Sequence, residues 1–114
     1  MAVTQNDSTP ARSSDEHLAA LGDEHRRAVV EVLAAEDRPV RLSRLAESVV
    51  AEMRDDSFGT PSHDDIDCAK LELHHHHLPK LDAAGVLDYD YEESRIVPTD
   101  DIHTVYDIVR SVTA

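Results

Sequence analysis

The segment that most constrains the fold of this chain runs from Leu73 to Leu87, with the sequence LHHHHLPKLDAAGVL. Leu78 and Leu81 are three residues apart and therefore share one face of a helix. Gly85 can adopt the left-handed conformation that commonly ends a helix. Residues 86–91, VLDYDY, have the β-branched and aromatic character of a strand. The sequence therefore predicts a helix that passes directly into a β-hairpin.

The net charge of the chain restricts the salt concentration at which it could bind nucleic acid. The 114 residues, enough for one domain, include 24 acidic and 11 basic side chains and have a formal net charge of −13. At ordinary salt this field repels phosphates. The acidic side chains are spread along the whole chain, which suits a very salty cytoplasm where charges are screened beyond about 3 Å. The composition favours that setting over a protein that simply avoids nucleic acid.

Cysteine use and hydropathy indicate the compartment. Cys68 is the single cysteine, so an intramolecular disulfide is impossible and a reducing compartment is expected. No apolar stretch approaches the roughly 20 residues that span a bilayer. Residues 1–14 are polar and lack a hydrophobic signal region. We therefore expect a cytoplasmic protein without membrane contact, in which residues 1–14 form a disordered N-terminal arm and residues 15–114 form one domain.

Breaks and caps divide the domain into helices and strands. Gly22 and Asp23 interrupt the first helical pattern, and Asp23 can cap the part that follows. Pro39 ends it, Ser43 is the expected cap of the second helix, and Thr99 that of the last. The expected elements are helices over 15–35, 43–53, 64–84 and from 99 on, an extended piece over 40–42, and strands over 86–92 and 95–98 that turn at Glu93-Ser94.

Helical spacing assigns two faces to the third helix, about residues 64–84. Pro79 falls inside it, so the helix must kink there or restart with Pro79 in its first turn. The buried face of the second helix is expected to include Leu45, Ala46, Val49 and Met53. For the third helix, the expected inner face is Asp67, Leu71, His74, Leu78 and Leu81, and the expected outer face is Ala69, Leu73, His76 and Lys80.

Helix, short strand, helix, helix, hairpin and helix is the order of winged helix-turn-helix domains. Residues 21–27 (LGDEHRR), 40–46 (VRLSRLA) and 76–87 (HHLPKLDAAGVL) resemble the first core helix, the second helix and the wing entry of ArsR-like repressors. Residues 17–112 as a whole are similar to a haloarchaeal winged-helix family of unknown function. The resemblance implies a mainly α fold with a small β-hairpin (α+β), a winged helix-turn-helix.

This resemblance implies a DNA-binding transcriptional regulator whose third helix (about 64–84) and wing (86–98) contact double-stranded DNA. The alternative is a protein–protein interaction module without DNA binding, which would dock a partner through Leu73 and the wing. The last helix, with Tyr106 beside its apolar stripe Ile102, Val105, Val109 and Val112, can cover the core or pair two chains; we expect a homodimer through the terminal helices. The expected DNA-contacting residues are Arg44, Arg54, Lys70, Leu73, His76, Lys80 and Arg95.

The four adjacent histidines raise the question of a metal site. Cys68, His74 and His77 are the residues that could supply ligands, with His63 or Asp64 nearby, but their spacing matches no zinc signature. The sequence therefore predicts no metal and no cofactor. It also contains no GxSxG, P-loop or paired-carboxylate motif, so we expect no enzymatic activity.

Overall fold

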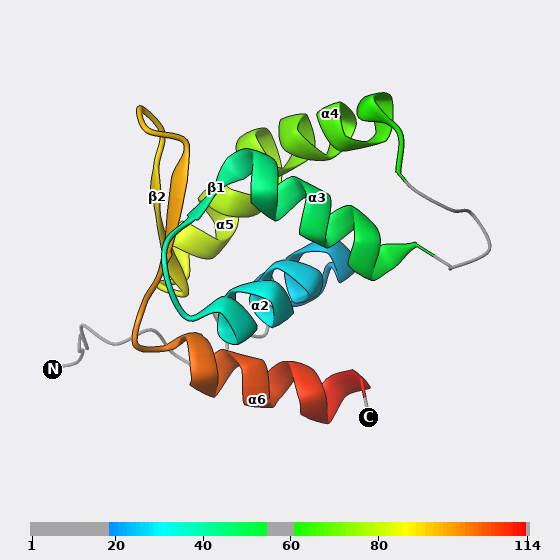
Figure 1. The fold of residues 1–114 in the computed structure, drawn as a ribbon. Coiled ribbons are helices and arrows are strands. Elements are labelled where there is room, and N and C mark those ends of the chain that lie inside the picture. Colours follow the sequence, from blue (N-terminus) through cyan, green and yellow to red (C-terminus); the bar gives the residue numbers. More distant parts are fainter. Residues whose placement is uncertain (1–18, 55–60, 114) are drawn as a thin grey trace, which may run out of the picture.

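The computed structural model describes residues 19–54 and 61–113, so the arm expected over 1–14 lies outside the described residues. The fold is mostly helical with one small antiparallel sheet, an α+β architecture (Figure 1). The elements are α2 (Glu24–Glu36), β1 (Val40–Arg41), α3 (Leu42–Met53), α4 (His63–Glu72), the π-helical segment η3 (Leu73–His77), α5 (Leu78–Ala83), β2 (Leu87–Asp90), β3 (Arg95–Pro98) and α6 (Ile102–Thr113).

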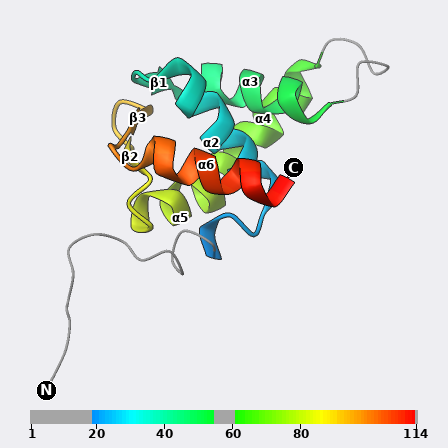
Figure 2. The same cartoon turned by 90° about the horizontal axis from the view of Figure 1, so that it is seen from below.

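Helix α2 lies at the centre of the domain, between α3 and α6, in both views (Figures 1 and 2). Helix α4 packs on α3, and the β2–β3 hairpin stands at the end of the domain, beside α5. The side chains of Val29, Val30 and Leu33 on α2 are fully buried. The core is therefore built around α2.

Helix α2 starts as the sequence predicted, with Asp23 as its N-terminal cap. The carboxylate of Asp23 accepts hydrogen bonds from the backbone N–H groups of His25 (2.7 Å) and Arg26 (3.4 Å), which satisfies helix donors that lack a partner. The helix closes at Asp37, whose φ of 54° is left-handed and whose N–H donates to the carbonyl of Leu33. The side chain of His25, in the first turn of this helix, is exposed.

The second helix begins one residue earlier than expected, and its cap was predicted wrongly. Arg41 occupies the capping position without a side-chain hydrogen bond, so Ser43 does not cap. Instead the N–H of Leu42 donates to the carbonyl of Ser94 in the hairpin, at 2.8 Å. A backbone group from a distant segment thus satisfies the helix start. Leu45, Ala46 and Val49 are buried as expected, whereas Met53 is 37% exposed.

The three strands pair antiparallel in the order β1-β3-β2. Ile96 at the centre of β3 lies opposite Val40 on one side and Tyr89 on the other, and all three side chains are buried. The hairpin turn is longer than the expected Glu93-Ser94. It spans residues 91–94, because the carboxylate of Asp90 accepts hydrogen bonds from the N–H groups of Glu92 and Glu93.

The expected third helix is a succession of α4, η3 and α5. Ser62 and Asp65 form a reciprocal capping box at its start. The N–H of Leu78 donates to the carbonyl of Leu73, five residues earlier, as in a π turn. Helix α5 then starts with Pro79 in its first turn, so of the two predicted alternatives, a kink or a restart, the structure has the restart.

The buried and exposed faces of the segment formed by α4, η3 and α5 differ from those predicted. Leu73, expected on the outer face, is 1% exposed, and Leu71, expected on the inner face, is 59% exposed. A π turn carries residues five apart to nearly the same face, so Leu73 and Leu78 are both buried. Leu73 therefore cannot serve as the DNA-contacting residue that the sequence predicted.

Helix α6 closes the core on the far side of α2. Its residues Ile102, Val105 and Val109 are buried, which confirms that the apolar stripe covers the domain's own core. Thr99 contributes to the helix start as expected, because its hydroxyl accepts a hydrogen bond from the N–H of Asp101. The same hydroxyl lies 2.7 Å from the carbonyl oxygen of Gly85, to which it donates.

Candidate functional site

The residues expected to contact DNA do not share one surface environment. His76, Lys80 and Arg95 have exposed side chains, Lys70 is half-buried, and Leu73 lies in the core. Of the expected residues on the third helix, His76 and Lys80 are therefore the fully accessible ones.

Two of the arginines expected to contact DNA instead form ion pairs within the domain. Arg44 near the start of α3 lies 3.1 Å from the carboxylate of Glu36. This hydrogen bond is the main cause that lowers the pKa of Glu36. Arg54 just after α3 lies 2.8 Å from the carboxylate of Asp65 in the capping box of α4. Both pairs are partly solvent-exposed, so each contributes little to stability, but each engages a cation that was expected to contact DNA.

Sequence reasoning named Arg95 but missed the neighbouring cation Arg41. Arg41 on β1 lies directly opposite Arg95 on β3, and both side chains are exposed. Like charges directly opposite each other destabilise a sheet. Among the described residues, no carboxylate lies within ion-pair distance of either arginine; Arg41 makes only a long contact (3.5 Å) with the carbonyl of Glu93. The alternation of Val40 and Arg41 in a strand was the signal that could have identified this position.

The exposed face of α4 is acidic. Asp64, Asp67 and Glu72 are exposed there, together with Cys68 and Leu71. A groove of about 270 Å³ lies between α3 and α4, and its lining includes apolar side chains together with Cys68 and Glu72. This half of the third helix presents negative charge to an approaching phosphate.

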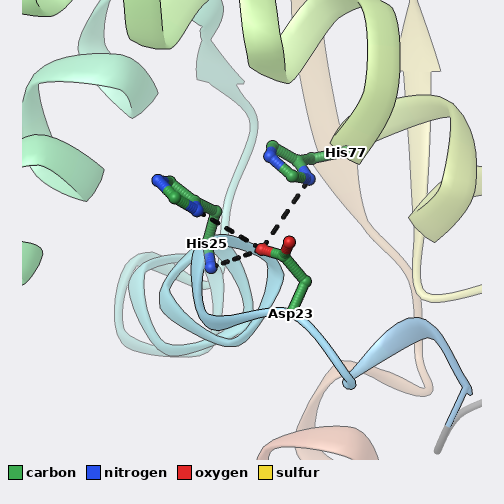
Figure 3. A group of neighbouring side chains, drawn as sticks. All are labelled: Asp23, His25 and His77. Carbon is green, nitrogen blue, oxygen red and sulfur yellow. Dashed lines mark hydrogen bonds and ion pairs between the residues drawn. The ribbon is translucent and has the colours of Figure 1, made fainter.

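Titratable side chains converge where the N-terminus of α2 meets the end of η3 (Figure 3). The carboxylate of Asp23 lies 3.3 Å from Nδ1 of His25 and 4.0 Å from Nδ1 of His77. The two imidazole rings are parallel within 6°, with centroids 5.2 Å apart. One potential ligand atom from each of the three residues lies within 4.8 Å of the others. We call this group the Asp–His–His cluster.

His77 is the buried member of the cluster, with 6% of the residue exposed. Its burial lowers the pKa of the imidazole, which favours the neutral ring, while the charge of Asp23 acts in the opposite direction. Nη1 of Arg26 lies 3.3 Å from its Nδ1. A guanidinium can only donate, so in the neutral ring Nδ1 is the unprotonated nitrogen, and its lone pair accepts this hydrogen bond.

Asp23 is the anionic member. Burial alone would raise the pKa of its carboxyl, but the backbone hydrogen bond from His25 and the nearby charges of His77 and Arg26 outweigh this effect, and the pKa is lowered. The carboxylate is therefore ionised at neutral pH. It combines a structural role, the capping of α2, with a position between two imidazoles.

The three residues named from the sequence as possible metal ligands do not converge. Cys68 lies exposed at the groove beside α4, and Nδ1 of His74 is 2.8 Å from the hydroxyl of Tyr89. Only His77 of that set belongs to the Asp–His–His cluster, which is the one such group within residues 19–54 and 61–113. Its other members lie far away in the sequence, so spacing within the histidine run could not have revealed it.

Comparisons with other proteins identify a family. Residues 18–97 match the family model described as "Domain of unknown function (DUF7344)". No curated protein and no solved structure matches the chain. Within the described part of the chain, no helix is long and apolar enough to cross a membrane.

Proposed function

Because the chain belongs to the DUF7344 family of domains of unknown function, whose description states no activity, we propose a function from its fold and surface charges. The domain is a winged helix-turn-helix transcriptional regulator that binds double-stranded DNA in the salt-rich cytoplasm of a haloarchaeon. The order of its helices and its hairpin supports this proposal, as does the resemblance of residues 21–27, 40–46 and 76–87 to ArsR-like repressors.

The observation that carries the proposal is the exposed pair Arg41 and Arg95, which lies beside the turn of the hairpin. Two like charges directly opposite each other are unfavourable in the free domain, and among the described residues neither arginine forms an ion pair, although Asp90 on β2 is the other cross-strand neighbour of Arg95. A DNA phosphate placed between them would remove that repulsion. In winged-helix complexes the hairpin lies on the DNA backbone while the third helix enters a groove. His76 and Lys80 are the accessible side chains that the end of the third helix would bring to the DNA.

Electrostatics determines the conditions under which binding occurs. The net charge of −13 opposes DNA at low salt. At molar salt the screening length is about 3 Å, so the overall repulsion vanishes while direct contacts between arginine and phosphate persist in weakened form. We therefore expect binding to be measurable in concentrated KCl.

The test is fluorescence anisotropy of a labelled duplex from the region upstream of the protein's own gene, in concentrated KCl, against a scrambled duplex of equal length. We expect saturable binding that favours the upstream sequence. Arg41→Glu and Arg95→Glu should each weaken binding and reduce its salt dependence by about one phosphate contact. Arg38→Glu, an equal charge change at an exposed site just after α2, is the matched control. If all three variants weaken binding equally, only the net charge matters and the proposed interface is wrong.

A second candidate, a protein–protein interaction module, is favoured by one specific observation. The exposed face of α4 combines the acidic Asp64, Asp67 and Glu72 with Leu71, which is 59% exposed. This combination suits a basic partner surface with an apolar contact better than it suits phosphate. A folded wild-type protein that binds neither duplex in concentrated KCl would favour this candidate.

We further propose that the regulator is a homodimer, as two DNA half-sites require. The buried stripe of α6 is engaged with α2, so a second copy would have to pair through the residues that α6 leaves half-buried, Tyr106 and Ile108. Light scattering in concentrated KCl should give the mass of two chains. A single-chain mass at concentrations well above those used for DNA binding would exclude this arrangement.

A further inference from the structure

We propose that Asp23, His25 and His77 bind a divalent transition-metal ion of the zinc class. The three residues approach from two parts of the chain that are far apart in sequence: Asp23 and His25 stand at the start of α2, and His77 ends η3 (Figure 3). This proposal does not rest on DNA binding, and its test does not use DNA.

The distances fit the ion. Zinc lies about 2.0–2.1 Å from imidazole nitrogen and 2.0–2.2 Å from carboxylate oxygen, so two ligands of a tetrahedral centre are about 3.4 Å apart. The carboxylate oxygen of Asp23 is already 3.3 Å from Nδ1 of His25. Its distance to Nδ1 of His77 is 4.0 Å and must shorten by about half an ångström. Because the two imidazole planes are nearly parallel, the exposed ring of His25 must also turn until both rings point at the ion.

The ligand set selects the class of metal. Two imidazoles and one carboxylate suit Zn²⁺, Co²⁺ or Ni²⁺, whereas Mg²⁺ and Ca²⁺ prefer oxygen ligands alone. Three protein ligands leave a fourth tetrahedral position for water. His25 and Glu72 also line the groove between α3 and α4, which opens to solvent and provides an entry path.

The charges around the cluster act in both directions. Asp23 and the nearby Glu72 both exert an attractive influence on positive charge at His77. The guanidinium of Arg26 opposes a metal, because it donates to the same Nδ1 that would bind the ion, at 3.3 Å. Metal binding therefore requires Arg26 to release His77. Removal of this cation should tighten binding, whereas a surface site elsewhere would not respond to it.

The neighbouring histidines do not form an equivalent site. His74 is hydrogen-bonded to Tyr89, and His75 and His76 are exposed. A run of exposed histidines can nevertheless collect metal ions weakly during purification. The experiment must therefore distinguish the Asp–His–His cluster from the histidine run.

The test is titration of the chelator-stripped full chain with Co²⁺, followed by visible absorption, and competition with Zn²⁺. We expect one site with the strong absorption of tetrahedral Co²⁺. Asp23→Asn and His25→Gln should each weaken binding by at least about tenfold. His76→Gln is the matched control and should leave the affinity unchanged, and Arg26→Gln should increase it. Asparagine caps a helix as well as aspartate does, so Asp23→Asn keeps the start of α2 intact.

A second readout is independent of spectroscopy. A metal bound only by the folded chain raises the temperature of thermal unfolding, because it joins α2 to the end of η3. Excess Zn²⁺ should raise this temperature in wild type and in His76→Gln, but not in Asp23→Asn.

Three results would overturn the proposal. Affinity that survives both Asp23→Asn and His25→Gln but is lost in His76→Gln would place the metal on the histidine run as an adventitious ion only. A thiolate-to-cobalt charge-transfer band would place it on Cys68. Absence of any Co²⁺ or Zn²⁺ binding at micromolar protein would exclude a site altogether.

Discussion

Leu71 and Leu73 lie two residues apart where α4 passes into η3, and replacement of each by alanine should affect the stability of the domain very differently. Leu73 is 1% exposed and Leu71 is 59% exposed. The two substitutions remove the same atoms from the same stretch of helix. The comparison therefore measures burial with the chemistry held constant.

The magnitude follows from these exposures. Burial of a leucine side chain contributes about 1.5–3 kcal/mol, and the cavity left by its removal increases the cost of Leu73→Ala to about 2–5 kcal/mol. Leu71→Ala changes an exposed site and should stay within about 0.5 kcal/mol of wild type. For a domain of this size, 2 kcal/mol corresponds to a decrease in the unfolding temperature of at least about 8 °C.

Guanidinium unfolding followed by circular dichroism, in concentrated KCl, measures both variants. A wild-type helical spectrum for each folded variant is the control. If Leu71→Ala costs as much as Leu73→Ala or more, the helix phase set by the π turn is wrong, and the outer-face position first expected for Leu73 is restored.

Three further predictions concern side chains that cap helix α4 or accept a hydrogen bond from strand β2. Ser62→Ala removes the capping hydrogen bond to the N–H of Asp65 and should lower the free energy of unfolding by about 1 kcal/mol in urea titrations. Hydrogen bonds from Ser62 are the main cause that lowers the pKa of Asp65 below 3.8, so its carboxylate stabilises the fold above that pH and loses this effect on acidification. Asp65→Asn should therefore lose less thermal stability than wild type between about pH 5 and pH 3; equal losses would contradict this assignment. Asp82→Ala leaves the half-buried N–H of Tyr89 without its 2.9 Å acceptor and should cost about 1–3 kcal/mol, whereas Asp82→Asn, which keeps an acceptor, should cost less in the same titration.

Local signals predicted most of the element order. Asp23 caps α2 because a carboxylate can reach N–H groups two and three residues ahead. Gly85, with a φ of 80°, follows α5 as expected, and Pro79 stands at the restart of the helix. These interactions span only a few residues, so the sequence contains all their partners close together.

Predictions failed where a distant segment supplied the partner. Ser43 was expected to cap α3, but the carbonyl of Ser94 takes the first N–H of that helix. The faces of the third helix were assigned from an uninterrupted α-helical period, which the π turn between Leu73 and Leu78 breaks. A constant period cannot anticipate this shift, because packing of both leucines into one core determines it.

The candidate sites also combine residues that the sequence alone could identify with residues that only the tertiary structure brings next to them. Arg95 could be named from its position in the hairpin, but its neighbour Arg41 is defined by strand register. His77 could be named from the histidine run, yet its partners Asp23 and His25 belong to another helix. Likewise, Arg44 could be named as a surface cation, but its ion pair with Glu36 depends on how α2 and α3 pack.

The sequence by itself determined the acidic character, the order of helices and strands, and the positions of the local caps and breaks, because these depend on composition and on contacts within a few residues. Only the tertiary structure decided which leucines are buried, which arginines are paired within the domain, and that Asp23, His25 and His77 meet. Those features depend on distances between segments far apart in the chain, and packing of α2 against its neighbours sets these distances.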